Sequence, residues 1–147
     1  MATPSKRKIK AKSSQPLTVI LQDTRLKKFS LEILLQVEEA GGGLMQLEYE
    51  VSIISSTNID ELAASLRISG MGHNKNDPSK IAFTVDAVML GIFELSRKPS
   101  EEELKGAVGI DMANFIAPVL ADSIETAMVK AGYPRLVIPR HVPEQSR

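Results

Sequence analysis

The sequence predicts an α+β fold, in which a four-stranded antiparallel sheet is covered on one face by a long helix and one short helix. Residues 80–95 alternate between apolar and less apolar side chains, which is typical of a long strand with one buried face. Shorter alternating stretches precede it, and residues 112–131 carry an apolar helical stripe. Strands with one apolar face, followed by helices, indicate a sheet that is covered on one side.

Three stretches before residue 80 are expected to form the other strands. The first covers residues 17–33, where a change of phase near Asp23 predicts a β-bulge. The second and third cover residues 47–53 and 62–69, each with alternating apolar positions. Residues 70–79 are rich in glycine, asparagine and proline, so they predict a turn that leads into the long strand.

The helical part begins after the long strand. An S-x-x-E capping box at residues 100–103 predicts a short helix that runs to about residue 108, where Gly109 interrupts it. The long helix follows over residues 112–131. Pro118 lies in this segment and is expected to kink the helix or to mark its first turn.

Length and composition indicate one domain, residues 16–139, between a disordered basic arm (1–15) and a flexible tail (140–147). The arm has a second interpretation, as an electrostatic tether to nucleic acid or anionic lipid.

The 18 basic and 18 acidic residues cancel, so overall charge predicts neither a nucleic-acid partner nor membrane binding. The sequence lacks cysteine, as expected for a cytoplasmic protein. No apolar run is expected to insert into a membrane.

Residues suited to catalysis or to metal binding are sparse. His73 and His141 have no carboxylate at ligand spacing, and Gly41, Gly42 and Gly43 lack the downstream lysine of a phosphate-binding loop. No serine lies in a nucleophile-elbow motif. We therefore expect a protein that is not an enzyme, with no metal site and no cofactor.

The segment between the first two strands, residues 34–45, is apolar at both ends and has three glycines in its middle. We call it the crossover and expect it to be flexible, because consecutive glycines disfavour regular structure. Its apolar side chains exceed what a simple turn buries, which predicts a partly open apolar groove. The residues expected to contact a client there are Leu34, Leu35, Val37, Leu44 and Met45.

Residues 49–142 resemble the SecB protein-export chaperones. The matching residues occur in the family's order: Ala82, Phe83 and residues 91–93 for its AF…GIF strand, Gly109, Asn114 and Pro118 for its G-x-x-x-x-N-x-x-x-P helix signature, Ile124, Met128 and Val129 for its apolar ridge, and Pro134 and Leu136 for its P-x-L exit.

The resemblance implies a SecB-like fold and a homotetramer built as a dimer of dimers. It also implies ATP-independent holding of unfolded or precursor polypeptides, with delivery to the SecA motor. The helical stripe is wider than one sheet face needs, so we expect it to pack against a second copy as well. The residues expected at this oligomer interface are Phe115, Val119, Ile124 and Met128.

Three departures from the family pattern bear on the pathway. Lys28 replaces one acid of the family's SecA-binding patch, leaving Glu32, and residues 73–80 lack the acids expected before the long strand. No second helix is expected after Pro139. Residues 98–105 are longer than the exporters' connection and resemble the SecB-like chaperones encoded beside toxin–antitoxin pairs.

These departures predict that SecA binding is weak or absent. Two alternatives to a general export chaperone stay open: a dedicated chaperone of an antitoxin, and an oligomerisation module without a client. We expect neither a nucleic-acid partner nor membrane insertion.

Overall fold

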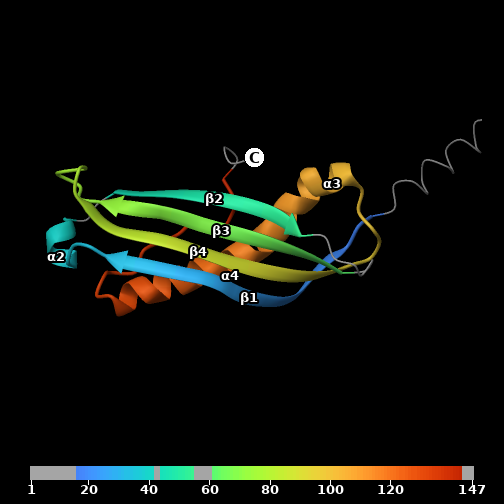
Figure 1. Ribbon diagram of the computed structural model, residues 1–147, viewed down its shortest axis with the longest axis horizontal. Helices are drawn as coiled ribbons and strands as arrows, with labels where there is room; N and C mark the ends of the chain where they lie inside the picture. The colour runs from blue at the N-terminus through green and yellow to red at the C-terminus, as the bar shows by residue number, and fades with distance from the viewer. Residues whose placement is uncertain (1–15, 42–43, 55–60, 144–147) are drawn as a thin grey trace, which may run out of the picture.

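The computed structural model describes residues 16–41, 44–54 and 61–143. The expected basic arm, residues 1–15, lies outside this part of the chain. The strands form one antiparallel sheet in the order β1-β4-β3-β2, and α4 crosses behind it (Figure 1). The elements are β1 (Val19–Ile33), α2 (Val37–Ala40), β2 (Leu44–Ile54), β3 (Glu61–His73), β4 (Ile81–Leu95), α3 (Glu101–Lys105) and α4 (Ala107–Lys130).

The core lies between α4 and the sheet face that it covers. Alternate residues of β3 and β4 point towards the helix, and the antiparallel register sets Leu66 beside Met89 and Leu62 beside Phe93. The side chains buried most completely are Leu66, Ile68, Phe93, Met112, Ile116, Leu120, Ile124, Met128 and Ile138. The predicted α+β fold, with a four-stranded sheet covered on one face, is therefore confirmed.

β1 is irregular at two positions. Its register with β4 shifts between Leu21 and Asp23, at the bulge that the sequence predicts, and again between Leu26 and Lys28. The second shift restores the apolar residues Phe29 and Leu31 to the covered face, opposite Ala87 and Val85.

Residues 70–73 belong to β3 and not to the predicted turn, which was placed too early. Gly70 and Gly72 are present because neighbouring atoms leave no room for a side chain. A Cβ at Gly70 would lie 2.0 Å from the carbonyl oxygen of Gln46, and one at Gly72 would lie 2.2 Å from the Phe83 ring. Composition suggests a turn there, whereas cross-strand packing needs the glycines inside the strand.

The helical break lies at Gly106 and not at Gly109. α3 begins with the predicted capping box, in which the Ser100 hydroxyl accepts a hydrogen bond from the Glu103 amide at 3.1 Å. Gly109 lies inside α4, where a Cβ would approach the Leu104 carbonyl oxygen to 2.5 Å. α4 also continues through Pro118.

By length and composition alone α4 could cross a membrane, with a mean hydropathy of 1.4 over 18 residues. The apolar stripe of α4 is buried against the sheet, including Met112, Ile116 and Leu120. Core helices of folded domains pass the same test of length and composition, and α4 has that position here.

After α4 the chain forms an irregular segment, residues 133–142, which we call the C-terminal strap. It packs on α4 and β2: the Tyr49 hydroxyl donates to the Pro139 carbonyl at 2.6 Å, and the Val142 amide donates to Asn114 Oδ1 at 2.8 Å. Arg140 pairs with Glu125 at 2.6 Å, and Val142 is buried. Residues 140–142 are thus part of the packed domain and not of the predicted tail.

Candidate functional site

The crossover contains the short helix α2, although three consecutive glycines predict an irregular segment. α2 forms one helical turn, in which the amides of Glu39 and Ala40 donate to the Gln36 carbonyl, and Gly41 ends it with a φ of 64°. The helix forms because the residues before the glycines are competent helix formers, and the first glycine supplies the left-handed C-cap.

A small apolar pocket lies between α2, the start of β2, the β3–β4 hairpin and the C-terminal strap. Its volume is about 150 Å³. It is lined by Val37, Ala40, Leu44, Met45, Gly72, His73, Ala82, Phe83, Tyr133, Pro134 and Leu136. The lining is mostly apolar, so the pocket suits one apolar side chain of a partner.

The five residues expected to bind a client are not equivalent in the structure. Val37, Leu44 and Met45 line the pocket together. Leu44 and Leu34 are 62% and 47% exposed, so both offer apolar surface to a partner. Leu35 packs against the core and does not line the pocket. The structure therefore brings together three of the five, with Leu34 exposed nearby in the same crossover.

The opposite wall of the pocket consists of residues that the sequence pattern does not indicate as a site. Phe83 and Tyr133 meet edge to face, with ring centroids 5.7 Å apart and an interplanar angle of 75°. Leu136 of the strap also lines the pocket. The sequence pattern places Phe83 on the covered face of β4 and Tyr133 at the helix end. No periodic signal shows that these residues, 50 positions apart, share a pocket with the crossover.

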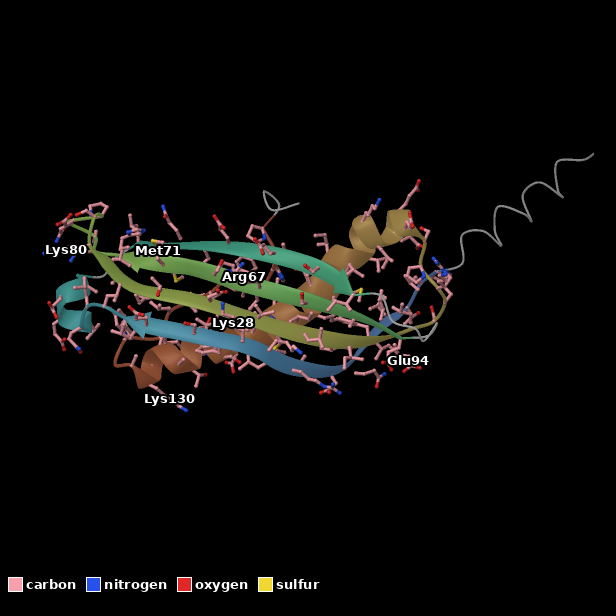
Figure 2. All side chains as sticks on the ribbon, in the orientation of Figure 1. Lys28, Arg67, Met71, Lys80, Glu94 and Lys130 are labelled. Atoms are coloured by element: carbon pink, nitrogen blue, oxygen red, sulfur yellow. The ribbon has the colours of Figure 1, made fainter. Side chains whose placement is uncertain are left out.

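The uncovered face of the sheet carries a charge network at its centre. Lys28 and Arg67 flank β4 opposite Val88 (Figure 2). Both bind Asp86 at 2.8 Å. Hydrogen bonds from Arg67 and then from Lys28 lower the pKa of Asp86 to about 2, so this carboxylate stays charged at neutral pH. Lys28, which the resemblance aligns with an acidic position, is committed to an ion pair within the chain.

Two of the four residues expected at an oligomer interface are buried inside this chain. Ile124 and Met128 are 1% and 0% exposed because they face the sheet, so their predicted contact with a second copy is wrong. Phe115 and Val119 are 48% and 39% exposed, and the Phe115 ring also lies 6.3 Å from the buried Phe93 ring. Sequence periodicity identifies the stripe, whereas only the packed structure shows which of its edges the sheet leaves open.

Among residues 16–41, 44–54 and 61–143, no group of three or more histidine or acidic side chains could hold a metal ion. His73 and His141 instead have backbone carbonyls as neighbours, at 2.9 Å from Pro78 and 3.0 Å from Arg140.

Comparison with known proteins finds relatives in sequence and in structure. The chain is 34% identical over 98 residues to protein-export protein SecB 2 of Polaromonas naphthalenivorans (strain CJ2), a match that covers 67% of this chain and 56% of that protein. It is 40% identical over 65 residues to protein-export protein SecB of Janthinobacterium sp. (strain Marseille), covering 44% and 37%. No protein-family model matches the chain.

The fold also matches the Rv1957 SecB-like chaperone of Mycobacterium tuberculosis, solved in complex with a ChAD peptide from the Rv1956 HigA1 antitoxin. The TM-score is 0.70, with 18% identity, over 82% of this chain and 88% of that one. The chain is similar to SecB proteins in sequence and has the fold of a SecB-like chaperone. It spans about half the length of the curated SecB relatives that it matches.

Residues that carry the SecB resemblance have structural roles in this SecB-like chain. Gly91 lies under Ile116, and a Cβ there would approach Ile116 Cδ1 to 2.8 Å. Asn114 accepts the Val142 amide and so attaches the strap to α4. These positions maintain the packing of helix, sheet and strap, whereas the exposed apolar residues of the crossover are available for binding.

Proposed function

We propose that this SecB-like chain is an ATP-independent holdase chaperone. It binds extended apolar segments of non-native polypeptides and keeps them unfolded for export or assembly. It acts in the cytoplasm as a homotetramer, a dimer of dimers, and it is not an enzyme and uses no cofactor. It does not bind nucleic acid or insert into membranes.

The observation that carries this proposal is the apolar pocket beside an exposed crossover. A client side chain that enters the pocket meets Val37, Leu44 and Met45, and Leu34 extends the apolar surface. Burying one such side chain contributes roughly 1.5–3 kcal/mol. Several contacts of this size give useful affinity without requiring a defined client sequence.

The test is the double substitution Val37→Ser with Leu44→Ser, assayed by suppression of aggregation of a chemically unfolded enzyme. We expect holding activity to fall at least tenfold, because two apolar contacts are lost. The matched control is Ile20→Ser with Ile54→Ser, which removes two exposed apolar side chains from strands outside the pocket. Equal activity in both variants and the wild type would place client binding elsewhere.

A second candidate is a dedicated chaperone of one antitoxin. It is favoured by the fold match to a SecB-like chaperone whose structure holds an antitoxin peptide, and by α3, formed within the connection that resembles that branch. A panel of unfolded proteins distinguishes the two candidates. Comparable affinity for unrelated clients supports the general holdase, and tight binding of a single antitoxin segment supports the dedicated one.

Binding to SecA is expected to be weak or absent. The sheet face carries Lys28 and Arg67 at its centre, both paired with Asp86, and so lacks a concentrated negative patch there. Titration calorimetry with SecA measures this directly, and micromolar or tighter binding would contradict the expectation.

A further inference from the structure

The crossover is attached to the rest of the chain by side chains on both sides of the client pocket. On the helix side, the Tyr133 hydroxyl donates to the Leu35 carbonyl at 2.7 Å. On the hairpin side, Asn74 Nδ2 donates to the Glu39 carbonyl in α2, also at 2.7 Å. Both bonds end on backbone atoms, so they fix the path of the crossover whatever side chains it carries.

The two donors are themselves held in place. The Tyr133 amide donates to the Met128 carbonyl in the last turn of α4, and its ring packs on Phe83. Asn74 sits in the β3–β4 turn, where its amide donates to the Lys80 carbonyl and its Oδ1 accepts the amides of Asn76 and Asp77 at 2.8 and 3.0 Å. Each bond to the crossover therefore starts from a fixed point.

The Tyr133 hydroxyl stays protonated at neutral pH and so can donate this hydrogen bond. Burial of the ring, together with the charges of Glu39 and Glu38 on α2, raises the pKa of Tyr133. The phenol thus remains a donor under the conditions in which a cytoplasmic chaperone works.

We propose that Tyr133 and Asn74 are positioning residues that keep the client pocket formed before a client arrives. The inference rests on the proposed holdase function and deepens it. A crossover with three consecutive glycines loses much conformational freedom when it becomes ordered. The two bonds order the backbone of residues 34–41 in the free protein, so client binding does not have to do so. Their loss should then speed client dissociation more than it slows association.

The closing experiment compares four full-length proteins: wild type, Tyr133→Phe, Asn74→Asp and Tyr49→Phe. Asn74→Asp keeps the Oδ1 acceptor of the turn, replaces the donor to Glu39 with an acceptor, and adds a negative charge beside α2. Tyr49→Phe is the matched control, because it also removes one hydroxyl-to-carbonyl bond, to Pro139 at 2.6 Å, but does not touch the crossover.

Two measurements are made on each protein. Hydrogen exchange of the amides of residues 34–41 reports the order of the crossover without any client. Binding of reduced, carboxymethylated α-lactalbumin is followed through the tryptophans of that probe, since this chain contains no tryptophan.

We expect faster crossover exchange, and a Kd raised about threefold to tenfold, in Tyr133→Phe and in Asn74→Asp. Tyr49→Phe should leave the exchange rate of the crossover amides and the Kd for the probe unchanged. Crossover exchange at the wild-type rate in both test variants overturns the inference, and so does equal loss of affinity in the Tyr49→Phe control. If the wild type fails to bind the probe, the holdase proposal and the client role are wrong, and the exchange data alone decide whether these residues order the crossover.

Discussion

At the scale of single residues, Glu125 carries a charge inside the fold. Its side chain is 3% exposed and binds Arg140 at 2.6 Å, Arg135 at 3.4 Å and the Ile138 amide at 2.9 Å. Hydrogen bonding by Arg140, opposed by burial and helped by the Ile138 amide, lowers the pKa of Glu125 to about 2. One carboxylate on α4 thus holds the C-terminal strap, and with it Leu136 at the wall of the pocket.

Glu125→Gln should destabilise the protein by about 2 kcal/mol. The amide still accepts the Ile138 N–H but leaves the Arg140 charge without its counter-charge, and breaking a buried pair is costly even when one partner reaches solvent. Urea unfolding measures the change. Glu48→Gln, at an exposed position of β2, is the control and should change stability by less than about 0.5 kcal/mol. Equal effects of the two substitutions would show that the pair does not stabilise the strap.

Stability should fall as pH falls from about 5 towards 2. The folded-state pKa values of Glu125, Asp86 and Glu103 are each about 2, below the ordinary values of 4.5, 3.8 and 4.5. A lowered pKa gives stability that is fully present above the ordinary value and is lost as the folded state takes up its proton. Urea midpoints measured across this range check the prediction. The slope should be shallower in Glu125→Gln, and an unchanged slope would assign the acid sensitivity to other groups.

At the scale of elements, the packing of β4 against α4 depends on Gly91. Gly91 has no side chain on the covered face of the sheet, and this leaves room for Ile116 of α4, which is fully buried. The long strand can therefore approach the helix closely at its middle, and the bulky side chains Phe93 and Met89 fill the space on either side.

Gly91→Ala should destabilise the protein by about 1–3 kcal/mol, because the new Cβ overlaps Ile116 Cδ1 at 2.8 Å. Adding Ile116→Val removes that methyl group and should recover part of the loss, while Cγ1, which also lies 2.8 Å from the new Cβ, stays. A double-mutant cycle in urea measures the coupling between the two positions. Additive effects would contradict direct contact as the cause.

At the scale of the whole molecule, the open surface of α4 is the feature that favours assembly. The sheet covers only one side of this helix, and it leaves Phe115 and Val119 partly exposed. The open edge strands of the sheet, β1 with 15 residues and β2 with 11, add a second reason to assemble, since exposed edges invite pairing.

Phe115→Asp with Val119→Asp should lower the oligomeric state. Light scattering of the wild type should give four times the 16.0 kDa chain mass, and the variant should give a smaller species, because two charges cannot be buried between helices. Val137→Asp, on the most exposed apolar side chain of the strap, is the control and should keep the wild-type mass. A wild-type monomer at micromolar concentration would remove the tetramer from the proposed function.

Elements whose signals are local can be predicted from the sequence alone. The period of two over residues 80–95 is a direct consequence of strand geometry and predicts β4 to within one residue. The capping box at Ser100 likewise predicts where α3 begins, because the signal and the structure involve the same four residues. The apolar residues of the crossover could also be identified from the sequence, because the composition of residues 34–45 shows more apolar side chains than a simple turn buries.

Contacts between residues far apart in the sequence become visible only in the folded structure. Tyr133 bonds to Leu35 across 98 positions, and no local pattern encodes a contact at that separation. Ile124 and Val119 belong to one helical stripe, yet one is buried by the sheet and the other is exposed, because the placement of the helix on the sheet sets that boundary. Gly70 and Gly72 have the composition of a turn but lie in a strand, since the atoms that exclude a side chain come from β2 and β4. Local sequence signals therefore predict the helices and strands, whereas packing between distant segments brings the pocket residues together.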